Sequence, residues 1–241
     1  MKINNILLVT IIFFFTLSAF AQLSADQCKK MLSAYVEKTS AYGIPKGKRT
    51  YVMDITINIV LRQNHQNRET RVKMIVGAEQ MQYISSDVTA IQDQKDAFTI
   101  IHPQKTIIWT NGLKNNDPEK IKNKLKGVED SLITSSKIKN FKEADYQNKK
   151  VILITLEPAF SIQKRYKIEK MEYYFNSKDE KIEQSITYYR STEAIEKKIT
   201  TYNEVDFNYK SSFNSPVFNE VFGSNKKLLP KYKGYKLIDN R

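Results

Sequence analysis

Residues 51–61 read YVMDITINIVL, and they are the clearest indication of the fold class in the chain. Apolar side chains occupy every second position of this stretch: Tyr51, Met53, Ile55, Ile57, Ile59 and Leu61. An alternation with a period of two is typical of a β-strand that packs one face on a core and turns the other toward solvent. The stretch therefore predicts a long strand in a sheet with one apolar face.

More strands are predicted after this one in the sequence. Polar turn residues at 64–67 separate it from a second strand, and further runs with strand character lie at 71–76, 79–85, 97–101, 105–110, 151–156, 166–175, 182–190 and 195–207. The connections between most of these runs are short, so neighbouring strands are expected to pair antiparallel as a meander.

Two helices are predicted beside the sheet. Ser24 and Gln27 form a capping-box pattern, after which apolar residues recur with helical spacing at Cys28, Met31, Leu32, Tyr35 and Val36. A second helix is predicted to begin at Asn116-Asp117-Pro118 and to carry an apolar side of Ile121, Leu125, Val128 and Leu132. The predicted fold class is α+β, with a strongly curved antiparallel sheet (a half-open β-barrel) and helices on its concave side.

Composition limits the function classes. The chain has 241 residues, is 41% hydrophobic and carries 39 Lys and Arg against 26 Asp and Glu, for a formal net charge of +13. These values favour a folded, basic protein over a disordered one. One Cys and two His leave little material for disulfides, for cysteine-cluster metal sites or for histidine-based catalysis.

The N-terminus has the features of a secretory signal peptide. Lys2 precedes an apolar run over residues 6–15, and small residues stand at Ala19 and Ala21. The run is shorter than the roughly 20 residues of a membrane-spanning helix, which disfavours an uncleaved anchor. The predicted divisions are a signal peptide at 1–21, a half-barrel domain at 22–222 and a basic C-terminal tail at 223–241. Export places the mature protein in the periplasm or in the extracellular space.

A search for catalytic motifs is negative. The sequence has no nucleophile elbow, no zinc-protease motif, no phosphate-binding loop and no dinucleotide fingerprint. His65 and His102 fall in predicted turns, and the acidic group of Asp87, Asp93 and Asp96 is better suited to capping a turn than to binding calcium. We therefore predict no enzymatic activity, no cofactor and no metal.

The order of these elements resembles the LolA/LolB-like family of outer-membrane lipoprotein carriers. The similarity is carried by Met81-Gln82-Tyr83 at a strand end, by the segment 98–109 that ends in Trp109, and by the strand 151–156 with Glu157-Pro158 after it. It spans roughly residues 24–222. The family's Arg-Pro pair is missing, because residues 77–80 read GAEQ, so no family arginine is carried over.

The resemblance implies a half-barrel around an apolar cavity that binds a lipid or an acylated lipoprotein. Methionines are adaptable enough to line such a cavity, although the same residues also suit an ordinary dry core. Alternation along its strand places Trp109 on the same face as Ile107, and we expect this face to line the cavity. The expected lining residues are Tyr51, Met53, Ile55, Ile57, Ile59, Leu61, Met74, Met81, Tyr83 and Trp109.

The C-terminal end concentrates positive charge. Five lysines stand there with no acidic residue until Asp239, and they are Lys226, Lys227, Lys231, Lys233 and Lys236. An anionic membrane surface or an acidic envelope protein is the expected partner, and nucleic acid is not, because the protein is exported. A solvated tail docked by Leu228, Tyr232 and Tyr235 is the alternative. Two hypotheses remain, namely a lipid carrier or sensor and an accessory envelope protein with a filled core.

Overall fold

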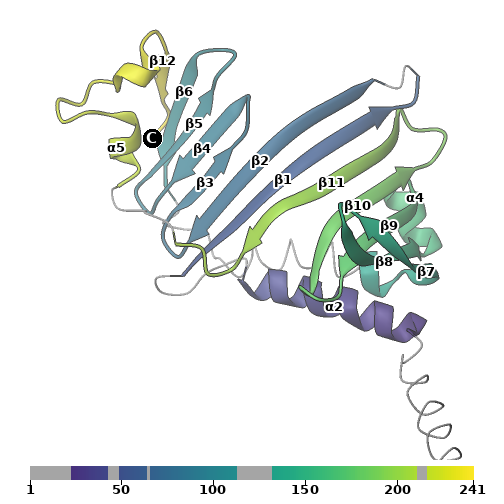
Figure 1. Ribbon diagram of the computed structural model, residues 1–241. Helices are drawn as coiled ribbons and strands as arrows, with labels where there is room; N and C mark the ends of the chain where they lie inside the picture. Colours follow the sequence, from purple (N-terminus) through teal and green to yellow (C-terminus); the bar gives the residue numbers. More distant parts are fainter. Residues whose placement is uncertain (1–22, 43–48, 64–65, 113–131, 211–215) are drawn as a thin grey trace, which may run out of the picture.

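The fold is a single long sheet with helices on it, seen in a computed structural model that describes residues 23–42, 49–63, 66–112, 132–210 and 216–241 (Figure 1). Twelve strands hydrogen-bond in the order β12-β6-β5-β4-β3-β2-β1-β11-β10-β9-β8-β7. Every neighbouring pair is antiparallel except β12 and β6, which are parallel. The sheet is open, because β7 and β12 are its two free edges.

The strands group into two meanders that meet where β1 pairs with β11. The first meander comprises β1 (Thr50–Leu61), β2 (Asn67–Gly77), β3 (Met81–Ile84), β4 (Val88–Gln92), β5 (Asp96–Ile101) and β6 (Thr106–Asn111). The second comprises β7 (Lys137–Tyr146), β8 (Lys149–Glu157), β9 (Ile168–Asn176), β10 (Lys181–Tyr189) and β11 (Ile195–Asp206). The C-terminal β12 (Lys236–Asp239) joins the outer edge of the first meander.

The helix α2 (Ala25–Tyr42) covers one face of the second meander (Figure 1). Its predicted capping box is present, since the Ser24 backbone N–H donates to Gln27 Oε1 at 2.7 Å and the Gln27 N–H donates to Ser24 Oγ at 3.2 Å. Its apolar side packs into a core with Ile154, Leu156 and Met171. Cys28 lies in this core as a free thiol, and burial raises its pKa.

A second core lies at the other end of the sheet, where the C-terminal segment folds back over β4, β5 and β6. This segment contains α5 (Phe218–Val221) and a short 3₁₀ helix, η1 (Pro230–Tyr232). Val217, Val221, Phe222 and Tyr232 pack there against Phe98 and other strand residues. Leu228, Leu229 and Tyr235 pack against the same core, so residues 216–239 are part of the folded structure.

The two cores lie on opposite faces of the sheet. Met171 belongs to the α2 core. It pairs across the strands with Thr187, which pairs with Lys198, which pairs with Ile59, so Met171 lies on the same face as Ile59. Phe98 belongs to the C-terminal core, and the ladder Phe98, Ile91, Gln82, Ile75, Val52 places it on the face of Val52. Because Val52 and Ile59 stand on opposite sides of β1, each end of the sheet is covered on a different face.

The sequence predictions of fold class and of most strands are confirmed. The predicted strand at residues 166–175 begins later, because residues 160–166 form the helix α4 (Phe160–Tyr166). Three strands were not predicted, namely β4, β7 and β12. The helices on the C-terminal core lie on the face opposite to α2, which the sequence did not indicate.

Some predictions concern residues outside the described part of the chain. These are the signal peptide at 1–21, His65, and the second helix as far as residue 131. Among the described residues, no helix is both long and apolar enough to cross a membrane.

Candidate functional site

The predicted cavity residues of β1, β2 and β3 share one face of the sheet. Met53 pairs with Met74, which pairs with Tyr83, and Tyr51 pairs with Val76, which pairs with Met81. Residues that are paired directly across a ladder point to the same side, as do alternate residues along a strand. The structure therefore brings together nine of the ten residues, namely Tyr51, Met53, Ile55, Ile57, Ile59, Leu61, Met74, Met81 and Tyr83.

This face is the one that α2 covers further along the sheet. Ile55 pairs with Tyr202 on β11, and Tyr202 packs against the α2 core. Tyr51 is buried and stacks on Phe207, with ring centroids 5.2 Å apart. Along the rest of β1 the apolar side chains are only partly buried. We call Met53, Ile55, Ile57 and Ile59 the β1 stripe, which is a partly buried apolar row in the middle of the sheet.

Trp109 is not on this face, contrary to the sequence expectation. It pairs with Phe98, on the face of Val52 and of the C-terminal core. Its Nε1–H donates to Asp96 Oδ1 at 2.7 Å, and its ring stacks on Phe98 at 5.3 Å between centroids. The expectation failed because the unpredicted strand β4 lies between β3 and β5. Without β4, the sequence could not show which side chains of β5 and β6 share a face with Tyr83.

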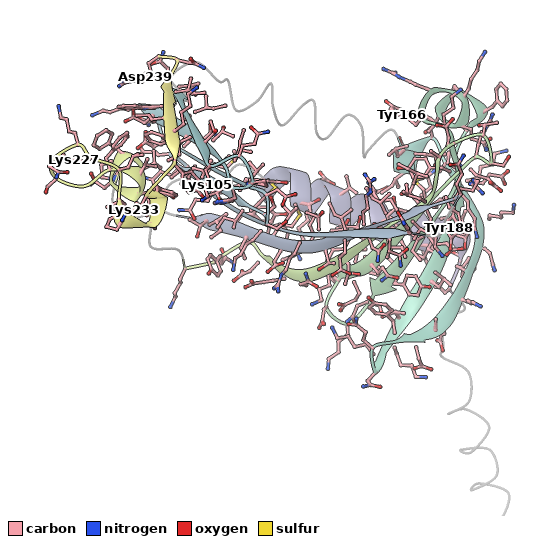
Figure 2. The ribbon with its side chains drawn as sticks, turned by 90° about the horizontal axis from the view of Figure 1, so that it is seen from above. Lys105, Tyr166, Tyr188, Lys227, Lys233 and Asp239 are labelled. Carbon is pink, nitrogen blue, oxygen red and sulfur yellow. The ribbon has the colours of Figure 1, made fainter. Side chains whose placement is uncertain are left out.

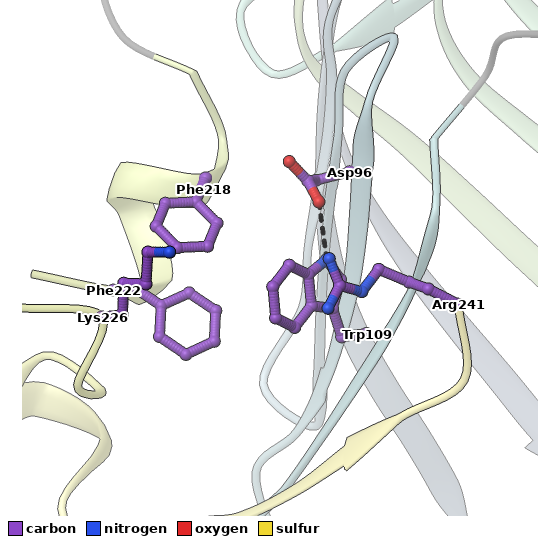
Figure 3. Close-up of a pocket in the computed structure, with 6 residues that line it drawn as sticks. All are labelled: Asp96, Trp109, Phe218, Phe222, Lys226 and Arg241. Atoms are coloured by element: carbon purple, nitrogen blue, oxygen red, sulfur yellow. Dashed lines mark hydrogen bonds between the residues drawn. The ribbon is translucent and has the colours of Figure 1, made fainter.

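A pocket of about 420 Å³ lies at Trp109 (Figure 3). Phe218 and Phe222 form one side of it, while Asp96, Trp109 and Arg241 form the other, and Lys226 also contributes. The Arg241 guanidinium lies over the indole, with 3.2 Å between Cζ and the ring centroid, and it is also paired with Asp239 at 2.6 Å. The cations and carboxylates at this pocket thus largely neutralise each other.

Asp93 attaches the C-terminal segment to the sheet. Its Oδ1 accepts the backbone N–H groups of Lys95 and Asp96, and its Oδ2 accepts that of Val217 at 3.0 Å. The predicted turn-capping role is therefore confirmed for Asp93. His102 has a structural partner as well, because its ring nitrogens lie 2.9 Å from Thr89 Oγ1 and 3.2 Å from Tyr235 Oη.

The predicted lysine cluster lies on this C-terminal segment. Lys226, Lys227, Lys231, Lys233 and Lys236 are all exposed, and Figure 2 shows Lys227 and Lys233 near one end of the molecule. Lys231 is paired with Glu220 at 3.8 Å. Within the described ranges, no group of three His, Cys, Asp or Glu side chains could hold a metal ion.

The face opposite the β1 stripe is polar in the middle of the sheet. Asp54 is buried there, and Arg71 donates to both of its carboxylate oxygens at 2.8 and 2.7 Å, while Asn203 donates at 3.2 Å. The hydrogen bonds from Arg71, and to a smaller extent the one from Asn203, lower the pKa of Asp54 despite its burial. The two faces of β1 therefore differ sharply in polarity.

We expect the Asp54 carboxylate to make stability depend on pH. Because its pKa is lower in the folded state than in the unfolded chain, its contribution is complete above the unfolded pKa of about 3.9 and is lost as the pH falls through the folded pKa. Asp54→Asn should remove part of the acid-induced loss of stability. Urea unfolding across this pH range would measure it, and identical pH slopes in the two proteins would contradict the assignment.

Comparisons with known proteins give matches only at the level of structure. No family model matches the chain, and no curated protein matches its sequence. LprF from Mycobacterium bovis is 9% identical, with 79% of this chain and 97% of that chain covered and a TM-score of 0.42. A LolA superfamily protein from Nitrosomonas europaea is 8% identical, with 80% and 99% covered and a TM-score of 0.28.

A chain in the structure of the MucA/MucB complex from Pseudomonas aeruginosa also matches. It is 6% identical, with 82% of this chain and 63% of that chain covered and a TM-score of 0.37.

Proposed function

We propose that this protein is a non-enzymatic binding protein of the cell envelope that holds an acyl chain of a lipid or lipoprotein. The observation that carries the proposal is the β1 stripe. Its four side chains follow one another along one face of a central strand and are only partly buried. A few strands away, the same face of the sheet is covered by the α2 core. Contiguous apolar surface of this kind is typical of ligand grooves.

The dimensions and the chemistry of the stripe suit an extended hydrocarbon chain. At the usual rise of a β-strand, Met53 to Ile59 spans about 20 Å, which is comparable to an extended long-chain fatty acid. Each methylene removed from water stabilises the complex by about 0.8 kcal/mol at most. Affinity should therefore increase with chain length until the stripe is covered, and Met53 and Met74 can adapt to chains of different shape.

Native mass spectrometry of the protein purified from its own cell envelope tests this proposal. A carrier or sensor should retain lipid in near-stoichiometric amounts, which extraction would release. A clean apo mass, together with no fatty-acid binding in solution, would favour the accessory protein. In that second hypothesis, the exposed lysines of residues 226–236 bind an acidic envelope protein or an anionic membrane.

A fluorescent reporter should respond only on the stripe face. Trp109 lies on the opposite face, so fatty-acid addition is expected to leave the emission of the native protein unchanged. In a Tyr83→Trp variant the new indole joins the face of Met74, and its emission should shift to the blue on binding. The variant keeps Trp109, so a shift of equal size in the native protein and the variant would place the ligand at Trp109, on the wrong face for this proposal.

The proposal includes export. Cleavage after Ala21 would make Gln22 the first residue of the mature protein in the periplasm. N-terminal sequencing of protein isolated from its native cells tests this, and retention of Met1 would contradict it.

A further inference from the structure

The helix α4 presents an unusually exposed aromatic side chain. Phe160, at its first position, is 73% exposed, compared with 40% for Ile84 and 37% for Leu237, the other exposed large hydrophobic residues among those described. None of the seven residues of α4 is buried. A phenylalanine this exposed costs free energy in water unless something covers it.

The helix is held firmly enough to present this side chain in a fixed direction. Gln163 donates to the carbonyl of Pro158 at 2.9 Å and accepts a hydrogen bond from Arg190 at 3.1 Å. The backbone N–H of Arg190 also donates to the carbonyl of Lys167 at 2.9 Å. Through Gln163 and Lys167, α4 is therefore tied to Arg190, which directly follows β10, so the exposure of Phe160 is a property of the folded chain.

Three exposed basic residues follow Phe160 within seven positions. Lys164 lies one helical turn away on the same side of α4, and Arg165 and Lys167 follow it; all three are exposed. The nearest acidic residues in sequence are Glu157 and Glu169, so the local balance stays positive, as does the whole chain at +13. An apolar side chain beside exposed Lys and Arg is the combination that binds at the interface of an anionic bilayer.

We propose that α4 is a membrane contact, in which Phe160 enters the interfacial region of an anionic bilayer while Lys164, Arg165 and Lys167 bind lipid headgroups. Charge complementarity selects the lipid surface. The contact is separate from the lysine cluster at residues 226–236, because Figure 2 shows Tyr166 of α4 at the end of the molecule opposite to Lys227 and Lys233. It also does not depend on an acyl chain at the β1 stripe.

Vesicle co-sedimentation of the full-length mature protein tests this contact. Binding to vesicles of phosphatidylglycerol and phosphatidylcholine should exceed binding to phosphatidylcholine alone and should weaken as salt rises. Phe160→Ser should lower the binding constant at least about tenfold, because it removes one phenylalanine ring from the interface. Ile84→Ser is the matched control, since it removes another exposed hydrophobic side chain and should leave vesicle binding unchanged.

A second variant reports the contact directly. In Phe160→Trp, emission should shift to the blue with anionic vesicles by more than in the native protein, whose Trp109 measures the background. The charge variant Lys164→Gln/Arg165→Gln should weaken binding about tenfold or more. No vesicle binding, equal binding by Phe160→Ser and the native protein, or no additional shift in Phe160→Trp would overturn the proposal. Since none of these side chains is buried, melting temperatures should remain at the native value.

Discussion

Ile57→Asp is expected to abolish acyl-chain binding in a protein that still folds. Ile57 lies in the middle of the β1 stripe, opposite Thr70 on β2 and Thr200 on β11. A carboxylate there would lose its water beneath a bound hydrocarbon chain without gaining a partner, which is a large cost. Binding should weaken by at least about a hundredfold, measured by displacement of a fluorescently labelled fatty acid.

Ile199→Asp is the matched control for this substitution. Ile199 is also partly buried in a central strand and pairs with Asn58, which places it on the face opposite to Ile57. Both variants introduce the same charge into the same part of the sheet, so their melting temperatures should fall by similar amounts. Only Ile57→Asp should lose acyl-chain binding. Equal losses in both variants would show that binding depends on the stability of the sheet and not on the stripe.

Phe98→Ala should have the largest effect on stability, about 3–5 kcal/mol. Phe98 is 1% exposed and stacks on Trp109 at 5.3 Å and against Phe222 at 5.8 Å between ring centroids. Its removal leaves a cavity between β5 and the C-terminal segment, which packs on that face of the sheet. Trp109 should become more accessible to acrylamide, and its emission should shift to the red.

Leu32→Ala provides the comparison at the other end of the sheet. Leu32 is completely buried in the α2 core, so the substitution should cost about 2–5 kcal/mol, but it should leave the native Trp109 emission unchanged. Urea unfolding followed by fluorescence and by circular dichroism would separate the two effects. Similar Trp109 quenching in the two variants would contradict the description of two separate cores.

The strand β1 illustrates how much of the fold is predictable from local sequence. Its alternation predicts the ends of the strand to within one residue and correctly assigns the apolar side chains to one face. Both follow from the period of two, which is a property of the strand alone. The capping box of α2 is equally local, since Ser24 and Gln27 satisfy each other within one turn. Both features needed no knowledge of the rest of the chain.

The position of Trp109 and the packing of the C-terminal segment depend on distant partners. β4 is short and reads VTAIQ, with no clear alternation, and missing it removed the link that relates the faces of β3 and β5. β12 has only four residues and pairs with β6, far away in sequence. From sequence alone the C-terminal residues look like a basic tail, because the partners that fix them are distant. β6 pairs with β12, and the buried carboxylate of Asp93 accepts the backbone N–H of Val217 at the start of the segment. The pocket at Trp109 arises from the same contacts.

The pairing of β1 with β11 has a consequence for how the chain folds. Nearly all other ladders join strands that are neighbours in sequence, so their hairpins close short loops, but Ile55 must find Tyr202 across most of the chain. Loop-closure entropy makes such a contact late and slow, whereas local hairpins form early. We expect two independently collapsing halves whose joining limits the refolding rate. Destabilising substitutions at the β1–β11 seam should then slow refolding, whereas those at the tip of a hairpin should mainly speed unfolding.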